Sequence, residues 1–171
     1  MSTNRLPPTF YGAPATELAP KLLGKVLCCR RDGIVRKAHI TETECYYGET
    51  DTACHAHKGR TKRTETLYHA GGISYIYLCY GIHELLNVVT GPEGHPEAVL
   101  LRGVEGYDGP GKLTKYLGID RRLNAADLTV SDELWLEDDG TEYEYEALPR
   151  VGIGYASPED QARLWRFRRK E

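Results

Sequence analysis

The alternation of apolar and polar positions predicts a helix and then a hairpin in the first part of the chain. Apolar residues recur at helical spacing from Ala15 and give way after Gly24 to the strand-like run Lys25 to Cys29. The turn sequence RRDG follows, and β-branched residues at period two then continue to Tyr46. We therefore expect residues 25–46 to form a hairpin whose second strand ends at Tyr46.

The remainder of the chain is mainly strand-like after a long polar excursion. Residues 48–66 lack an apolar period and are expected to form a loop. Few helices and no regular βαβ alternation indicate an α+β fold, a single domain over residues 1–171. We expect a curved, mainly antiparallel β-sheet flanked by short helices, with a protruding β-hairpin. The expected elements are a hairpin over 73–90 that turns at Tyr80 and Gly81, a strand at 97–105, a short helix at 109–119, and strands at 134–138 and 148–156.

Length and composition limit the class of protein. A chain of 171 residues suits one hydrophobic core. The N-terminus has no apolar stretch behind a basic start, and no apolar run approaches the roughly 20 residues of a membrane span. The five cysteines are an odd number without the spacing of a disulfide framework, so free thiols are expected. These features predict a soluble, cytoplasmic protein.

Charge is distributed unevenly along the chain. The net charge of −3 argues against a broad, nonspecific binder of polyanions. Basic side chains nevertheless cluster at two places, and the simplest interpretation of each cluster is a solvated face. The clusters consist of Lys58, Arg60, Lys62 and Arg63, and of Arg163, Arg166, Arg168, Arg169 and Lys170.

The stretch TETECYYGETDTACHAH, residues 41–57, concentrates reactive side chains and first suggests a metal site. Cys54 and His57 form a C-x-x-H pattern with Cys45 nearby, which could supply thiolate and imidazole ligands to zinc. Structural zinc sites usually pair two short ligand motifs, whereas this chain has one and offers no obvious fourth ligand. The sequence therefore favours a different use of these residues.

Carboxylates in the same stretch suggest acid–base chemistry. Glu42 and Glu44 point to the same face of an extended strand. A glutamate at a strand end beside the aromatic Tyr46 could have its pKa raised into the range of a general base. The alternative is an exposed glutamate on an edge strand.

Several flat rings and fixed polar groups could enclose a planar heterocycle. The alternative is a sheet face lined by tyrosine. The residues concerned are Tyr46, His55, Tyr75, Tyr77, Tyr80 and Asn87.

Five motifs in order resemble the alkyladenine DNA glycosylase family, also called the alkylpurine type of 3-methyladenine DNA glycosylase. The resemblance runs from about Phe10 to Phe167, and five ordered motifs are far more specific than any one of them. It implies a single mixed α/β domain with a curved antiparallel sheet. The motifs are ITETECYYGETDTACHAHKGR, YIYLCYGIHELLNVV, AVLLR, GPGKL and RVGIG.

The resemblance implies a role for each matching residue of the base site. Glu44 matches the general base that activates water for attack on C1′ of a flipped nucleotide. Arg102 and the main chain at Val151 match groups that place this water. Asn87 matches a residue that disfavours the exocyclic amine of guanine. Three residues match the enclosure of the flipped purine: Tyr46, His55 and Tyr77.

The resemblance also implies how the protein holds DNA. Tyr80 matches the side chain that enters the minor groove and fills the gap left by the flipped base. Arg60 and Lys112 match positions on the DNA-binding face, and Lys62 and Arg63 extend the cluster around Arg60. The implied partner is double-stranded DNA containing damaged purines, namely 3-methyladenine, ethenoadenine or hypoxanthine, with no metal, no cofactor and no membrane, and we expect a monomer.

Chemistry and class follow from the same residues. The matched site contains no lysine that could attack as an amine, so direct hydrolysis to an abasic site is expected, without strand cleavage. Only GVEGYD separates Arg102 from Gly109, where family members commonly carry a longer segment. A non-catalytic domain that binds damaged DNA and a zinc-dependent hydrolase remain as alternatives.

Overall fold

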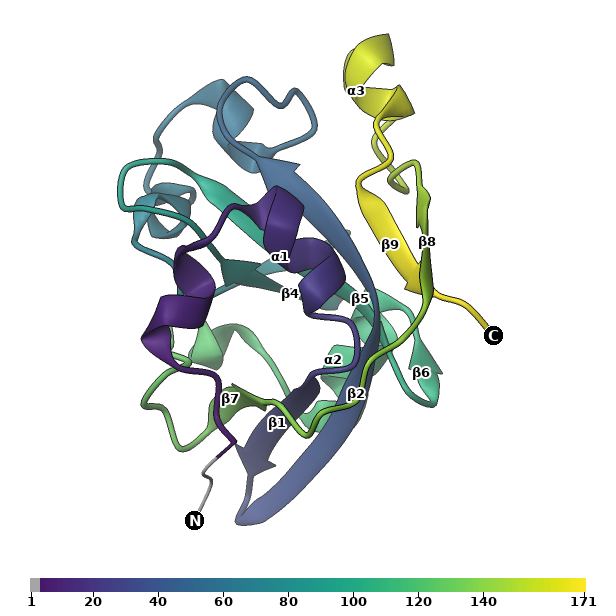
Figure 1. The fold of residues 1–171 in the computed structure, drawn as a ribbon. Coiled ribbons are helices and arrows are strands. Elements are labelled where there is room, and N and C mark those ends of the chain that lie inside the picture. Colours follow the sequence, from purple (N-terminus) through teal and green to yellow (C-terminus); the bar gives the residue numbers. More distant parts are fainter. Residues whose placement is uncertain (1–3) are drawn as a thin grey trace.

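The computed structural model describes residues 4–171, in which nine strands form one curved sheet with antiparallel pairing throughout (Figure 1). The main order is β3-β4-β5-β2-β1-β7; β6 pairs with β5, and β8 pairs with β9, which joins β2. The expected α+β class with a curved antiparallel sheet is confirmed. The strands are β1 (Val26–Arg31), β2 (Ile34–Tyr47), β3 (Ser74–Cys79), β4 (His83–Val89), β5 (Glu97–Val104), β6 (Tyr107–Asp108), β7 (Leu134–Glu137), β8 (Tyr145–Leu148) and β9 (Arg166–Arg169).

The long strand β2 organises the sheet because it pairs with three others. Its first half pairs with β1, from Ile34 opposite Arg31 to His39 opposite Val26. Its second half lies between β5 and β9, with Glu44 opposite Leu100 on one side and Arg166 on the other. β2 therefore leads from the core into the candidate site.

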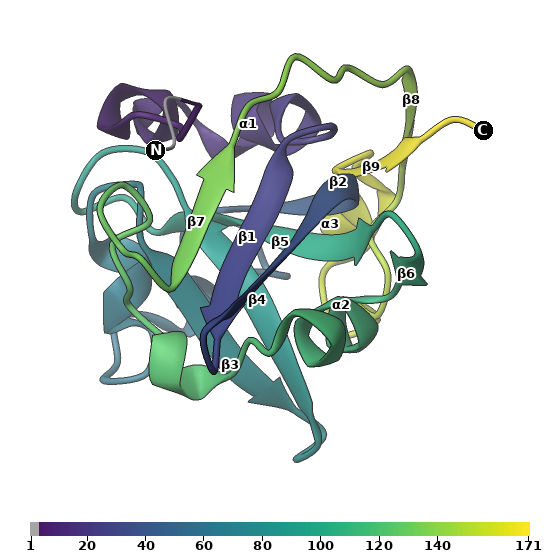
Figure 2. The ribbon, with the colours of Figure 1, turned by 90° about the horizontal axis from the view of Figure 1, so that it is seen from below.

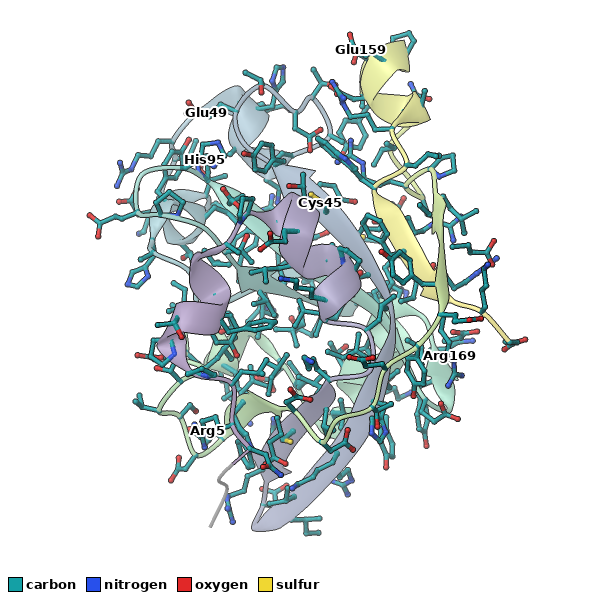
Figure 3. The ribbon with its side chains drawn as sticks, in the orientation of Figure 1. Arg5, Cys45, Glu49, His95, Glu159 and Arg169 are labelled. Atoms are coloured by element: carbon teal, nitrogen blue, oxygen red, sulfur yellow. The ribbon has the colours of Figure 1, made fainter. Side chains whose placement is uncertain are left out.

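A bulge in β2 and β5 reverses the faces of both strands. Ile40 pairs with Val104 and Thr43 with Leu101, while Glu42 faces Gly103 between them. Each strand thus has one extra residue, Thr41 in β2 and Arg102 in β5. A bulge of this kind re-aims the side chains that follow it. Ala38 and Ile40 face the main core before the bulge and Cys45 faces it afterwards (Figure 3), so Glu42, Glu44 and Tyr46 point away from that core.

Short helices cover the sheet. The main core holds Leu18 of α1 and Leu113 and Leu117 of α2, all fully buried against the sheet. The Thr43 hydroxyl donates to the Ala19 carbonyl at 2.7 Å, which fixes α1 on β2. Pro110 begins α2, as suits its fixed φ, and Gly118 ends it with a φ of 78°. The helices are α1 (Ala15–Lys21), α2 (Pro110–Leu117) and α3 (Pro158–Ala162), and the 3-10 turns are η1 (Pro8–Gly12), η2 (His55–Lys58), η3 (Glu65–Tyr68) and η4 (Arg121–Leu123).

Most expected elements are confirmed, and one is wrong. The hairpins β1–β2 and β3–β4 form as expected, and Figure 2 shows the β3–β4 hairpin protruding beyond the rest of the sheet, beside α2. The strand expected at 148–156 ends at Leu148 instead, because Pro149 lacks an N–H and Gly152 takes a φ of 73°. The strand β9 was not expected. The short connection after Arg102 proves to be a tight hairpin in which β6 folds back on β5.

Two further features concern the whole described chain. The five cysteines are free thiols, as expected. Among residues 4–171, none of the helices has the length and apolar character that crossing a membrane requires.

Candidate active site

Glu44 is the most deeply buried carboxylate of the candidate site. It is 0% exposed, and its side chain accepts hydrogen bonds from the Tyr46 hydroxyl at 2.7 Å and from the Val151 N–H at 2.6 Å. Burial raises the pKa of Glu44 above its usual value, against the opposing effects of Arg102, the Val151 N–H and the Tyr46 hydroxyl. A carboxylate in this setting can accept a proton from a water molecule held against it.

Arg102 lies at the bulge and faces two carboxylates. Its guanidinium is 3.6 Å from Glu44 and 3.9 Å from Glu42, and Glu42 also receives a hydrogen bond from Arg166 at 2.9 Å. The Nε of Arg102 is buried and has no hydrogen-bond partner within residues 4–171. A buried donor without a partner is costly, so a water or a substrate oxygen would be a favourable occupant beside Glu44.

The Val151 N–H is positioned by a buried ion pair next to it in sequence. Arg150 binds Asp51 through two hydrogen bonds of 2.7 and 3.0 Å, and both side chains are almost completely buried. The same guanidinium donates to the Cys45 carbonyl at 2.9 Å and lies 5.1 Å from the centre of the Tyr46 ring. Arg150 therefore joins β2, the loop after it and the segment after β8.

A second set of hydrogen bonds holds the same two segments together. Asp160 accepts from the Thr52 N–H at 2.9 Å and from the Thr52 hydroxyl at 2.5 Å. The Tyr155 hydroxyl donates to the Ala53 carbonyl at 2.8 Å. Sequence reasoning missed this connection, because the partners lie more than 100 residues apart and no local pattern marks them. The connection builds a fixed wall beside Glu44.

Aromatic side chains form a narrow pocket that opens into a wider cleft. The pocket measures about 40 Å³, room for about one water molecule. The cleft measures about 610 Å³ and shares with the pocket the residues Tyr46, His55, Tyr77 and Tyr155. Asn87 lies only in the narrow part, 4% exposed, with its side-chain amide donating to the Tyr75 carbonyl at 3.2 Å. A flat ring can therefore enter the cleft with its edge toward Asn87.

His55 is an uncharged part of the pocket wall at neutral pH. Its Nδ1 lies 2.9 Å from the Tyr75 hydroxyl, and its ring centre is 4.5 Å from that of Tyr77. Burial, assisted by the nearby charge of Arg63, lowers the pKa of His55 to about 4. The wall can therefore offer hydrogen bonds without a second positive charge.

Tyr80 stands at the tip of the β3–β4 hairpin, on the rim of the cleft. Its side chain is 90% exposed. Tyr80 and Gly81 have φ values of 52° and 70°, and the turn closes with a hydrogen bond from the Ile82 N–H to the Cys79 carbonyl at 3.1 Å. A tyrosine is unusual in this left-handed conformation, which Gly or Asn adopts more easily. Such strain often accompanies function.

The basic residues expected to contact DNA differ in their surroundings. Arg60 is paired with Glu65 at 2.5 and 2.7 Å, and its guanidinium lies 4.7 Å from the Tyr68 ring centre. Lys62 is exposed. Lys112 is exposed on the rim of the cleft, near Val151. The guanidinium of Arg63 lies 5.6 Å from the Tyr77 ring centre, at the aromatic pocket rather than among the outer cations.

Comparison with known proteins identifies the family. A family model described as methylpurine-DNA glycosylase matches residues 9–108 and 105–171. The chain belongs to the methylpurine-DNA glycosylase family. It is therefore a DNA glycosylase, a hydrolase of N-glycosyl bonds that acts on DNA.

Relatives of this glycosylase cover nearly its whole length. Three of them share the name "Putative 3-methyladenine DNA glycosylase". The protein from Psychrobacter cryohalolentis is 42% identical over 94% of this chain and 89% of its own. The Methanocella arvoryzae protein is 41% identical over 95% of this chain and 90% of its own, and the Borreliella afzelii protein is 40% identical over 92% of each chain.

The residues of the zinc alternative are used differently in this glycosylase. Cys45 faces the main core, and the His57 ring is hydrogen-bonded to the Glu49 carbonyl at 2.8 Å. Within residues 4–171, no three side chains of His, Cys, Asp or Glu lie together as a metal site would require.

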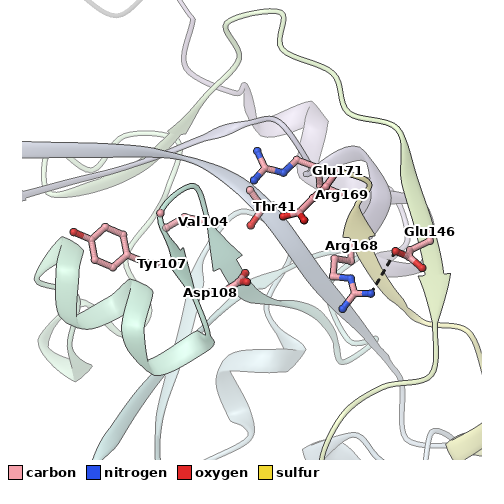
Figure 4. Close-up of a pocket in the computed structure, with 9 residues that line it drawn as sticks. Thr41, Val104, Tyr107, Asp108, Glu146, Arg168, Arg169 and Glu171 are labelled. Carbon is pink, nitrogen blue, oxygen red and sulfur yellow. Dashed lines mark hydrogen bonds and ion pairs between the residues drawn. The ribbon is translucent and has the colours of Figure 1, made fainter.

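A second hollow of about 610 Å³ lies beside the bulge, next to the C-terminal part of the sheet (Figure 4). Thr41, Tyr107 and Arg169 line it, and Arg168 there is paired with Glu146 at 3.3 Å. Its lining includes none of the site residues expected from the sequence. The expected residues gather instead around the aromatic cleft.

Proposed function

We propose that this glycosylase excises alkylated or deaminated purines by hydrolysis with a water activated by Glu44. The observation that carries the proposal is the buried Glu44 carboxylate, held by the Tyr46 hydroxyl and the Val151 N–H at the floor of an aromatic cleft. Its raised pKa suits a general base, and Arg102 keeps it ionised at neutral pH. The unpartnered Nε of Arg102 supports a role in orienting the water.

The aromatic cleft supports binding of a flipped purine. Tyr46, His55 and Tyr77 offer faces and edges for stacking, with Asn87 at the narrow end to discriminate against the exocyclic amine of guanine. Alkylation at N3 or N7 makes the purine cationic, which weakens the glycosidic bond and favours contact with π faces. Neutral lesions such as ethenoadenine and hypoxanthine would need protonation of the leaving base.

The surroundings of the cleft support binding of duplex DNA. The exposed Tyr80 can enter the stack and fill the gap of the flipped nucleotide, which offsets part of the cost of extrusion. Lys62, Lys112 and, after release from Glu65, Arg60 can contact phosphates. The position of Arg63 favours a different role, which is argued below. All cleft residues come from one chain, which fits action as a monomer.

Direct hydrolysis is favoured over attack by an amine. Lys112 is the one lysine among the described cleft residues, and it is exposed on the rim while Glu44 lies on the floor. An exposed lysine is protonated at neutral pH and is a weak nucleophile. The product would be an abasic site with an intact strand.

One assay tests these statements together. The protein is incubated with duplexes that carry a single 3-methyladenine, 1,N6-ethenoadenine or hypoxanthine, with and without EDTA, and free base, abasic sites and strand breaks are measured. We expect release of free base, intact abasic strands, no effect of EDTA and no product trapped by borohydride. Binding without release would favour the non-catalytic alternative, and loss of activity in EDTA would favour the zinc hydrolase.

A further inference from the structure

Two tyrosines of the aromatic cleft each carry an arginine guanidinium over the ring. The guanidinium of Arg150 lies 5.1 Å from the ring centre of Tyr46, and that of Arg63 lies 5.6 Å from the ring centre of Tyr77. A cation at this distance is attracted to the electron-rich face of the ring. Both rings that would stack on a purine therefore already interact with a cation.

The two arginines differ in their compensation. The charge of Arg150 is balanced by Asp51, with the two side chains 0% and 1% exposed. Arg63 is exposed, and no carboxylate among residues 4–171 forms an ion pair with it. Its neighbour in sequence, Arg60, has its own partner in Glu65. Arg63 therefore adds an uncompensated positive charge to the wall of the pocket.

The charge of Arg63 acts on the pocket as well as on solvent. Arg63 borders a hollow of about 760 Å³ that His55 and Tyr155 also line, and another of about 360 Å³ that Tyr75 and Tyr77 also line. After burial, it is the second cause of the low pKa of His55. A base stacked beside His55 and Tyr77 would experience the same charge.

We propose that Arg63 is a specificity-determining residue that lowers the affinity of the pocket for cationic purines relative to neutral purines. The proposal rests on the proposed function, because it assumes that the flipped base stacks on Tyr77. Two effects act in the same direction. Like charges repel across a partly desolvated wall, and a guanidinium on Tyr77 reduces the attraction that the ring can offer to a second cation.

Equilibrium binding separates this effect from chemistry. Glu44→Gln protein is titrated with one duplex containing hypoxanthine and one containing N7-methylguanine on a 2′-fluoro sugar, which resists loss of the base, at pH 6 where that base is cationic. Adding Arg63→Gln should improve the affinity for the cationic lesion relative to the neutral lesion by about three- to tenfold. Arg63→Lys keeps the charge and should leave this ratio within about twofold of the parent.

Lys62→Gln is the matched control, because it removes one exposed positive charge next to Arg63 in sequence. It should weaken binding of both duplexes equally and leave the ratio unchanged. An equal loss for both lesions in Arg63→Gln, with a flatter salt dependence, would make Arg63 a phosphate contact and overturn the proposal. An unchanged ratio in Arg63→Gln would overturn it as well, and Arg63→Met provides an independent neutral variant.

The two hypotheses fail in different ways. If the protein does not bind damaged purines in this cleft, the Glu44→Gln parent will not prefer either lesion duplex over undamaged DNA. If only the role of Arg63 is wrong, that preference will persist and the ratio between the lesions will not respond to Arg63.

Discussion

The floor of the cleft and the tip of the β3–β4 hairpin are built in opposite ways. At the floor, Glu44 is 0% exposed and held by three neighbouring groups, and the adjacent ion pair of Arg150 and Asp51 is buried. At the tip, Tyr80 is 90% exposed on a turn of two left-handed residues. The floor is organised before substrate arrives, whereas the tip can gain its contacts only from DNA. Mutations should therefore separate chemistry and stability from base flipping.

The largest effect is expected at the floor. Glu44→Gln should retain lesion binding but lower single-turnover excision by about two to four orders of magnitude, the usual contribution of a positioned base. Quenched-flow or gel assays at saturating enzyme, with binding measured in parallel, check this. Near-normal excision would remove Glu44 from the mechanism, and joint loss of folding and binding would indicate a structural role instead.

The buried charge of Glu44 also predicts two opposite pH dependences. Excision needs the carboxylate form, so the rate should fall toward one-tenth for each pH unit below the raised pKa of Glu44. Stability should change in the other direction, because a raised folded-state pKa stabilises the fold at low pH, and this contribution is lost as the pH rises through it. The melting temperature of Glu44→Gln should therefore exceed that of the parent increasingly from about pH 5 to pH 8. A constant difference would contradict the raised pKa.

The ion pair next to the floor should dominate stability. Asp51→Ala leaves Arg150 as an uncompensated buried charge and should cost about 3 to 5 kcal/mol in the free energy of unfolding. It also removes the acceptor of the Tyr47 and Ala53 N–H groups. Urea unfolding measures the loss, with Glu65→Gln as control, since that variant breaks only an exposed pair and should barely change the midpoint. Equal midpoints for the two variants would contradict the role of the buried pair.

Tyr80 should show the reverse pattern. Tyr80→Ala should leave stability within about 1 kcal/mol of the parent but weaken the flipped state by about 1 to 3 kcal/mol, the range for stacking of a base on an aromatic ring. The defect should be larger in duplex than in single-stranded DNA, where there is no stack to fill. Excision and 2-aminopurine fluorescence on both substrates measure it.

Tyr80→Asn sharpens the comparison, because Asn accepts the left-handed conformation better than tyrosine. This variant should melt at or above the temperature of the parent and still lose base flipping. A large fall in melting temperature without a duplex-specific defect would show that Tyr80 is a packing residue.

The difference between floor and tip also explains what the sequence could predict. The hairpin tip follows from local signals, since two β-rich runs flank Tyr80 and Gly81. The floor does not, because period two places Ile40 and Glu44 on one face, whereas the bulge at Thr41 and Arg102 puts Ile40 in the core and Glu44 in the cleft. The pairing of Asp51 with Arg150 joins residues 99 apart and leaves no local pattern. The role of Glu44 came from the resemblance and remains a prediction.

The smallest effects are expected among the exposed cations that surround the cleft. Each lost phosphate contact should flatten the slope of log affinity against log salt by about one. Lys62 is free to contact a phosphate, whereas Arg60 must first leave Glu65, so its gain on binding DNA is offset by the lost pair. Lys62→Gln should therefore reduce the slope by nearly one and Arg60→Gln by less, while Glu65→Gln, which releases Arg60, should strengthen binding at low salt. Titrations of a lesion duplex from 50 to 200 mM salt decide between these outcomes. Unchanged slopes in both Lys62→Gln and Arg60→Gln would place the DNA backbone elsewhere, on the cluster from Arg166 to Lys170.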